Sequence, residues 1–263
     1  MIIYTHKRFT NYLKMKEGNK MEIIVADNYD DISRIAASYI KELINEKSDA
    51  VLGLATGGTP VGTYKQLIDM YSNKEIDFSN VKTINLDEYI GLDGSHVQSY
   101  RYFMNNNLFD HINVKKENTH VPNGMAKDTD EEARKYDELI ENFGGIDLQI
   151  LGVGANGHIA FNEPGPYLNV NTHVTNLTDN TIEANARFFD SIVEVAKTAI
   201  TMGVGNIMKA KKIIVLANGK NKAEAVEKMI NGKVAASNPA SILQLHRDVT
   251  LIIDKDIKEE IER

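Results

Sequence analysis

Short, almost continuously apolar runs alternate along the chain with longer stretches in which apolar and polar residues are mixed. Several of the apolar runs contain almost no polar residue, which is typical of strands covered by helices on both faces. The runs predict strands at Glu22–Ala26, Ala50–Leu54, Val81–Asn85, Asp147–Gly152, Lys212–Ala217 and Val249–Asp254.

The amphipathic stretches between these runs have the spacing of helices, with apolar residues three and four positions apart. Asp30 is expected to be the N-cap of the first of them. Strands that alternate with helices predict an α/β domain. We therefore expect a single-domain, three-layer sandwich around a mostly parallel, Rossmann-like central sheet, with site loops at the carboxyl ends of the strands. The predicted helices are Asp31–Glu46, Val61–Tyr71, Thr129–Asn142, Asp179–Phe188, Val204–Ala210 and Lys222–Ile230.

Composition and charge narrow the class of protein. The 263 residues carry a net charge of −7 and include no cysteine. An acidic chain is a poor partner for nucleic acid, and a chain without cysteine has no disulfide, no cysteine-bound zinc and no thiol nucleophile. No segment approaches the ~20 apolar residues of a membrane span. Residues 1–20 are polar and have no apolar signal core. We expect them to form an extension outside a domain of residues 21–263, in a cytoplasmic protein without nucleic-acid or membrane partners.

The turn after the second predicted strand is rich in glycine and threonine. It reads Thr56-Gly57-Gly58-Thr59-Pro60 and leads into a helix. Glycines allow a close approach of the backbone to a ligand, and free N–H groups at a helix start attract anions. Because no Gly-Lys-Ser/Thr follows, it is not a Walker A loop. An anion cradle and a plain strand-to-helix turn remain open as interpretations.

A second glycine-rich turn, Gly152 to Gly157, matches G-x-G-x-x-G after a strand. A dinucleotide site also needs a helix at the third glycine, but two prolines and a glycine follow within nine residues, so we reject NAD(P). The turn instead presents His158, with Glu163 five residues later. A carboxylate beside an imidazole fixes its tautomer and raises its basicity. This pair favours catalysis over an ordinary surface or core histidine.

Acidic and basic residues follow other strand ends. Asp87 and Glu88 come directly after the third predicted strand, and neighbouring strand residues face opposite ways, so we expect only one of them to enter a cleft. A solvated loop or a helix cap is the alternative. Among the late basic residues, Arg187, Lys220 and Lys222 are candidates to complete an anion site, or simply solvated charges.

Taken together, these motifs resemble the glucosamine-6-phosphate deaminase family. The resemblance spans about residues 21–254, in the family's order and spacing. It is carried by the turn at 56–60, by the segments 86–92 and 152–164, and by Asn185-Ala-Arg187-Phe-Phe, 199–205 and 243–246.

The resemblance implies hydrolysis of D-glucosamine 6-phosphate to D-fructose 6-phosphate and ammonia, without a metal or organic cofactor. By matching positions, His158 would open the sugar ring and Asp87 would move a proton from C2 to C1 through an enolamine. Glu163, helped by Asn156, would orient His158. The substrate phosphate would be held by Thr56, Gly57, Gly58, Thr59, Arg187 and Lys222.

Two departures from the family pattern matter. Several members have Asp where this chain has Asn156, which can donate hydrogen bonds but carries no charge. Allosteric hexameric members bind N-acetylglucosamine 6-phosphate through basic residues after the Glu-Pro motif, whereas residues 164–180 here contain no Lys or Arg. We therefore expect a monomer or small homo-oligomer without that activation.

Three alternatives stay open. A 6-phosphogluconolactonase-like hydrolase uses similar turns and a histidine, but lactone opening needs no base at C2, so Asp87 argues against it. A non-catalytic sugar-phosphate sensor would lack acid–base residues that are present here. An enzyme for another amino-sugar phosphate, such as the galactosamine epimer, is the hardest to separate, because loop residues decide between epimers.

Overall fold

The structure is a computed structural model, and it describes residues 21–178 and 196–263. Seven strands form one parallel sheet in the order β1-β10-β9-β6-β2-β3-β5. These strands are β1 (Glu22–Ala26), β2 (Val51–Leu54), β3 (Lys82–Asn85), β5 (Thr119–His120), β6 (Leu148–Gly152), β9 (Lys212–Ala217) and β10 (Val249–Asp254).

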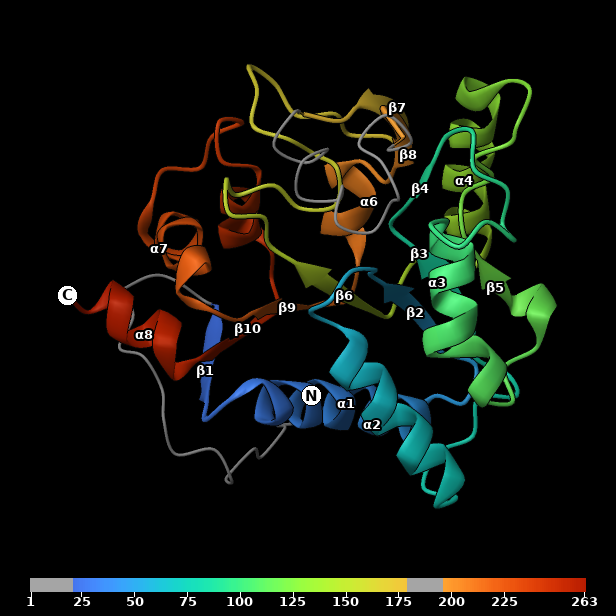
Figure 1. The fold of residues 1–263 in the computed structure, drawn as a ribbon, viewed down its shortest axis with the longest axis horizontal. Helices are drawn as coiled ribbons and strands as arrows, with labels where there is room; N and C mark the ends of the chain where they lie inside the picture. The colour runs from blue at the N-terminus through green and yellow to red at the C-terminus, as the bar shows by residue number, and fades with distance from the viewer. Residues whose placement is uncertain (1–20, 179–195) are drawn as a thin grey trace.

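Helices cover both faces of this sheet (Figure 1). Helices α1 and α2 lie together beneath it in this view, whereas α6 and a small second sheet lie above it. The helices are α1 (Tyr29–Glu46), α2 (Val61–Ser72), α3 (Tyr100–Asn107), α4 (Thr129–Asn142), α6 (Val204–Lys209), α7 (Ala223–Asn231) and α8 (Lys255–Ile261). The predicted three-layer α/β fold with a mostly parallel sheet is confirmed.

The second sheet is antiparallel and has the strand order β4-β8-β7. It consists of β4 (Asp87–Tyr89), β8 (Thr198–Thr201) and β7 (His173–Asn176). The sequence pattern did not predict these strands or the short helices α3 and α8. Short elements carry too few periods for an apolar pattern to show.

The predicted helix cap at Asp30 is wrong, and the predicted segments 1–20 and 179–188 are not among the described residues. Asp30 is not the N-cap of α1; Asn28 is, because its side chain accepts a hydrogen bond from the N–H of Asp31 at 3.0 Å. Asp30 lies in the first turn, where its charge still favours the helix dipole. The helix predicted at 179–188 lies outside the described residues, as does the predicted N-terminal extension 1–20.

The sheet reverses its direction of growth between β2 and β6, which are neighbours. From β2 the chain proceeds to β3 on one side, and from β6 the later strands β9 and β10 follow on the other side. The loops leaving β2 and β6 therefore diverge, and a crevice forms between them at the carboxyl ends, where α/β proteins bind ligands.

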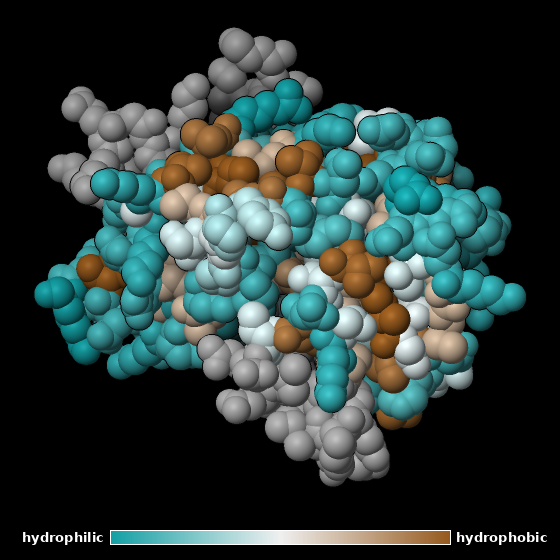
Figure 2. All heavy atoms as spheres, turned by 90° about the horizontal axis from the view of Figure 1, so that it is seen from above, coloured by the Kyte–Doolittle hydropathy of each residue, from teal (hydrophilic) through white to brown (hydrophobic). Residues whose placement is uncertain are grey.

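The apolar runs of the sequence are buried in one large core that includes every strand of the main sheet except β5. Seen from above, the surface is mainly hydrophilic, with hydrophobic residues gathered in local patches (Figure 2). In the described part of the chain, no helix is both long and apolar enough to cross a membrane.

Asp147 connects three parts of the chain at the opposite end of the sheet from the crevice. Its buried carboxylate lies 2.6 Å from the Nζ of Lys47 and 2.7 Å from that of Lys211, and it accepts the N–H of Val51 at 2.8 Å. Burial raises the pKa of Asp147, but the hydrogen bonds from Lys211 and Lys47 outweigh it, so the pKa lies below its ordinary value.

We expect Asp147→Asn to lower the free energy of unfolding by about 2 kcal/mol at pH 7, since charged hydrogen bonds to a buried group are lost. A lowered carboxyl pKa stabilises the fold above the unfolded-state value. The difference between wild type and variant should therefore shrink as the pH falls below about 4 and through the folded-state pKa.

Urea unfolding at pH 7 and at pH 3.5 measures this. Asp248→Asn is the matched control, because Asp248 also pairs with a lysine, Lys212 at 2.7 Å, but its side chain is 48% exposed. An equal loss of stability in both variants would contradict the role given to Asp147.

Candidate active site

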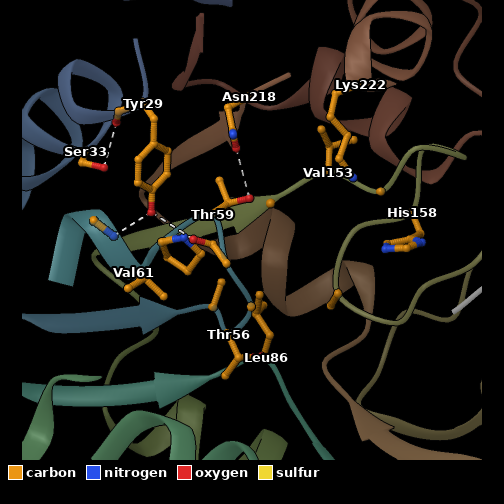
Figure 3. A pocket seen from close by; sticks show the side chains of 18 of the residues that line it. Tyr29, Ser33, Thr56, Thr59, Val61, Leu86, Val153, His158, Asn218 and Lys222 are labelled. Carbon is orange, nitrogen blue, oxygen red and sulfur yellow. Dashed lines mark hydrogen bonds between the residues drawn. The ribbon is translucent and has the colours of Figure 1, made fainter. Parts of the chain in front are cut away.

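A cleft of about 1280 Å³ lies at the carboxyl ends of β9, β6, β2 and β3, which are four adjacent strands. Each of these strands sends the residues that follow it to the wall of the cleft, and α1 closes one side (Figure 3). The polar side chains that line it include Tyr29, Asp30, Thr56, Thr59, Lys65, Asp87, Tyr100, Asn156, His158, Asn218 and Lys222.

The turn after β2 presents its backbone to this cleft. Gly57 has a φ of +92°, a left-handed conformation that glycine adopts without strain. A Cβ added to Gly57 or Gly58 would contact nothing within 4 Å, so open space lies above both residues. Within the described part of the chain, the N–H groups of Gly57, Gly58 and Thr59 donate no hydrogen bond. Three backbone donors without acceptors, in a turn with open space beside its two glycines, suit the turn to bind an anion.

The carboxylate of Asp87 lies at the start of β4, one residue beyond the end of the main-sheet strand β3. The backbone of β4 is held opposite Thr201 of β8, and Asp87 is only 6% exposed. Burial raises the pKa of Asp87 to about 8, with a smaller contribution from the negative charge of Glu88. A carboxyl group with such a pKa can exchange a proton near neutral pH.

Glu88, the neighbouring carboxylate, is not among the residues that line the cleft. Its oxygens accept the N–H groups of Tyr89 and Tyr100 at 2.8 Å and of Arg101 at 2.9 Å. Burial still raises the pKa of Glu88, although these three hydrogen bonds oppose it. Glu88 therefore fixes the start of α3, and only Asp87 of the pair lines the cleft.

Aromatic rings create the apolar surroundings near Asp87. Tyr89 and Tyr100 have ring centroids 4.6 Å apart, and Phe161 stacks on Tyr100 at 6.1 Å with an angle of 14° between the planes. The hydroxyl of Tyr100 donates to that of Tyr89 at 3.1 Å. Tyr100 and Phe161 line the cleft together with Asp87, and a carboxylate buried in such surroundings is costly to ionise.

His158 is supported by two residues of its own loop. Its Nδ1 lies 3.3 Å from Oε1 of Glu163, an ion-pair distance without the alignment of a hydrogen bond. Oε2 of Glu163 accepts the side-chain amide of Asn156 at 2.7 Å, and Oδ1 of Asn156 accepts the N–H of His158 at 3.1 Å. Asn156 thus joins Glu163 to the backbone of His158, and the imidazole extends toward the cleft (Figure 3).

The turn before His158 is shaped for this ring and not for a dinucleotide. A Cβ on Gly154 would come within 2.4 Å of the His158 ring, so only glycine leaves room for it. Gly157 has a φ of +88°. The residues that follow Gly157 form turns and an isolated bridge between Ile159 and Asn162, not a helix. The pyrophosphate-binding helix start of a dinucleotide site is therefore missing here.

Of the basic candidates, Lys222 lines the cleft, whereas Lys220 is exposed and is not among the described residues around it. Both belong to the short 3-10 helix η4 (Lys220–Lys222). The carboxylate of Asp254 holds the turn before it by accepting the N–H of Gly219 at 2.7 Å. Arg187 lies outside the described residues.

Among the cleft residues that sequence reasoning missed are Tyr29, Tyr100 and Asn218. Two of them had a usable signal, because Asn218 follows β9 directly and Tyr29 follows β1 by three positions, and strand ends are where sites form. Tyr100 comes eleven residues after β4 in the chain, so only the fold brings it to the cleft.

These features define an α/β protein with an anion-binding turn and acid–base groups in one crevice, and the comparisons with known proteins give its family. Residues 26–252 match the family of glucosamine-6-phosphate isomerases and 6-phosphogluconolactonases. The chain belongs to this family.

Within this family, the relatives with high sequence identity to this chain are deaminases. A glucosamine-6-phosphate deaminase of Clostridium beijerinckii is 58% identical over 92% of this chain and its own full length. One of Thermoanaerobacter sp. is 60% identical over 90% of this chain and 93% of its own. The structure of a monomeric glucosamine-6-phosphate deaminase, 46% identical, superposes with a TM-score of 0.89 over 91% of this chain and all of that one. A 6-phosphogluconolactonase from Trypanosoma cruzi, 18% identical with a TM-score of 0.73, shares the fold.

Because the pKa of Asp87 is raised, the free energy of unfolding should depend on pH through this residue. A carboxyl group whose pKa is higher in the folded state than in the unfolded state costs stability as the pH rises between the two values, here from about 4 to about 8. We expect Asp87→Asn to remove this cost and to be more stable than wild type by on the order of 1–3 kcal/mol at pH 8.5.

Thermal unfolding of both proteins at pH 5, 7 and 8.5 measures the effect. The advantage of the variant should grow with pH. A variant that is less stable than wild type at pH 8.5, or a difference that does not change with pH, would contradict the burial of an ionisable Asp87.

Proposed function

We propose that this chain catalyses the reaction of D-glucosamine 6-phosphate with water to give D-fructose 6-phosphate and ammonia, in the catabolism of N-acetylglucosamine and related amino sugars in the cytoplasm. The observation that carries the proposal is the position of Asp87, a buried carboxyl group with a pKa of about 8, in the same cleft as the supported imidazole of His158. The names of the relatives at 58% and 60% identity support it.

The phosphate group of the substrate binds at the turn after β2. Backbone N–H groups of Gly57, Gly58 and Thr59 donate to its oxygens, and the hydroxyl of Thr56 adds a donor. Lys222 supplies positive charge from the other side of the cleft, and Arg187 is proposed as a second cation. Binding at this remote group holds the reacting carbons in place.

The proton transfers take place at the other end of the sugar. His158 moves a proton between the ring oxygen and the C1 hydroxyl, which opens the pyranose. Asp87 then removes the proton at C2 to form an enolamine and returns it to C1, which leaves an imine at C2. Water adds to this imine, and ammonia leaves as the ketone forms. The proposed steps are proton transfers and a hydrolysis, which these side chains carry without a metal or organic cofactor.

Glu163 and Asn156 act on His158 and not on the substrate. The carboxylate of Glu163 stabilises the imidazole as it becomes positively charged, and Asn156 holds that carboxylate. The related lactonase reaction has no step at a C2 carbon, so it gives no role to a buried, high-pKa Asp87. This favours the deaminase over the lactonase.

We also propose that the enzyme acts as a monomer or small oligomer without activation by N-acetylglucosamine 6-phosphate. The absence of Lys and Arg from residues 164–180 supports this, because an anionic effector needs cations. The similarity to a monomeric deaminase over 91% of the chain supports it as well.

The first test is a product assay with D-glucosamine 6-phosphate. Wild type should release ammonia and fructose 6-phosphate in equal amounts, and Asp87→Asn should lose at least about 100-fold in kcat because the base is gone. Asp93→Asn is the matched control, since Asp93 belongs to the same acidic segment but not to the cleft lining. Full activity in Asp87→Asn, or rapid hydrolysis of 6-phosphogluconolactone in place of deamination, would refute the proposal.

The second test separates the two residues behind His158. We expect Glu163→Gln to lower kcat by about 100-fold, because the charge that stabilises the imidazolium is lost. Asn156→Ala should cost less than about 10-fold, because it loosens Glu163 without removing its charge. Measurement of kcat at saturating substrate checks this, and the reverse order of effects would show that Asn156 carries the support.

A further inference from the structure

Tyr29, the first residue of α1, makes two hydrogen bonds to the turn that leads from β2 into α2. Its hydroxyl donates to the carbonyl oxygen of Gly58 at 2.9 Å and accepts the N–H of Gly62 at 2.8 Å (Figure 3). One side chain from a different segment thus ties together the two ends of the Gly58–Gly62 turn. None of the roles described above uses this tyrosine.

The first of these bonds fixes the direction of a peptide plane. In a trans peptide the C=O of Gly58 and the N–H of Thr59 point to opposite sides. Because the carbonyl is held by Tyr29, the N–H of Thr59 points away from Tyr29. On the other side of this plane, Gly57 and Gly58 rotate easily, so this hydrogen bond limits a rotation that the glycines themselves allow.

The second bond occupies a donor of the first turn of α2. The N–H groups at the start of a helix lack partners within the helix, and Tyr29 satisfies that of Gly62. The N–H groups of Gly57, Gly58 and Thr59 in the described structure remain without acceptors. Tyr29 therefore takes up the Gly62 donor at the start of α2, whereas the three donors of the turn stay available for a ligand.

Close packing holds Tyr29 itself in place. A Cβ on Gly62 would come within 2.9 Å of Cε1 of Tyr29 and 2.2 Å of Oγ of Ser33, so the absence of a side chain at Gly62 lets α1 approach α2. Ser33 donates its hydroxyl to the carbonyl of Tyr29 at 2.9 Å. Tyr29 is half-buried, and the hydrogen bond from Ser33 holds its backbone within the first turn of α1.

We propose that Tyr29 is a positioning residue of the phosphate cradle. It holds the Gly58–Thr59 peptide in the orientation that directs backbone N–H groups to the phosphate of the substrate. It acts on substrate affinity and not on the proton transfers, because it is bonded to the turn and not to Asp87 or His158. This inference rests on the proposed function of that turn. A preorganised set of donors binds an anion more tightly than one that must be ordered on binding.

The test is Tyr29→Phe, which keeps the ring and removes the hydroxyl. We expect KM for D-glucosamine 6-phosphate and the dissociation constant of inorganic phosphate to rise by about 5- to 30-fold, and kcat to stay within about 3-fold. Steady-state kinetics and isothermal titration with inorganic phosphate give these values. Tyr71→Phe is the control, because Tyr71 lies at the far end of α2 and packs against Phe78; we expect no change in either quantity.

The outcomes separate this inference from the proposed function. Unchanged KM and phosphate affinity in Tyr29→Phe would overturn the inference, as would a fall in kcat with both affinities intact. A fall in thermal stability with unchanged phosphate affinity of the folded protein would show a purely structural role and overturn it as well. If wild type releases no ammonia but binds phosphate, and Tyr29→Phe binds it more weakly, the proposed function fails and the positioning role stands. If wild type binds no phosphate, the inference fails.

Discussion

The reversal of the sheet between β2 and β6 is the constraint on which the site depends. Parallel strands are joined by crossover connections that lie on the faces of the sheet. Where successive connections run in the same direction, the loops at the strand ends lie side by side and leave no gap between them. Here the connections leave β2 and β6 toward opposite edges. The glycine-rich turn after β2 and the histidine loop after β6 therefore face each other across a crevice. The adjacent strands β3 and β9 add Asp87 and the turn with Lys222 to the same opening.

The small antiparallel sheet explains how a carboxylate comes to be buried in this opening. After β3 the chain does not turn into a helix at once, as it does after β2, but continues as β4 and pairs with β8. In this arrangement Asp87 lines the cleft together with Tyr100, and Glu88 accepts hydrogen bonds from the start of α3. The burial costs stability and raises the pKa of Asp87 to about 8, a value that suits the proton transfer proposed for it near neutral pH.

Much of the geometry of the cleft is set by backbone and by side chains that support other side chains. Glycines at 57 and 58 leave space and free donors, and glycine at 154 leaves room for the His158 ring. Tyr29 and Asn156 each hydrogen-bond to a neighbour, the first to the carbonyl oxygen of Gly58 and the second to the carboxylate of Glu163. Such support keeps the reactive groups in one geometry, which is what makes donors and bases effective.

The sequence by itself determined the elements whose pattern is long or purely apolar. The bounds of β1, β9, β10 and α4 agree with the prediction to the residue, because continuous apolar runs and helical periodicity report burial directly. The same pattern placed the glycine turns, Asp87 and His158 at strand ends. The short strands β4, β5, β7 and β8 were missed, since their pairing depends on partners far apart in the chain.

Only the tertiary structure decided which strand ends are neighbours. The order of the strands, the opposite orientations of Asp87 and Glu88, and the contact of Tyr29 with a turn 29 residues later all follow from long-range packing. A local pattern records which face of an element is buried but not what it is buried against. The sequence therefore shows which side chains are available for chemistry, and the tertiary structure determines which of them lie in the same cleft.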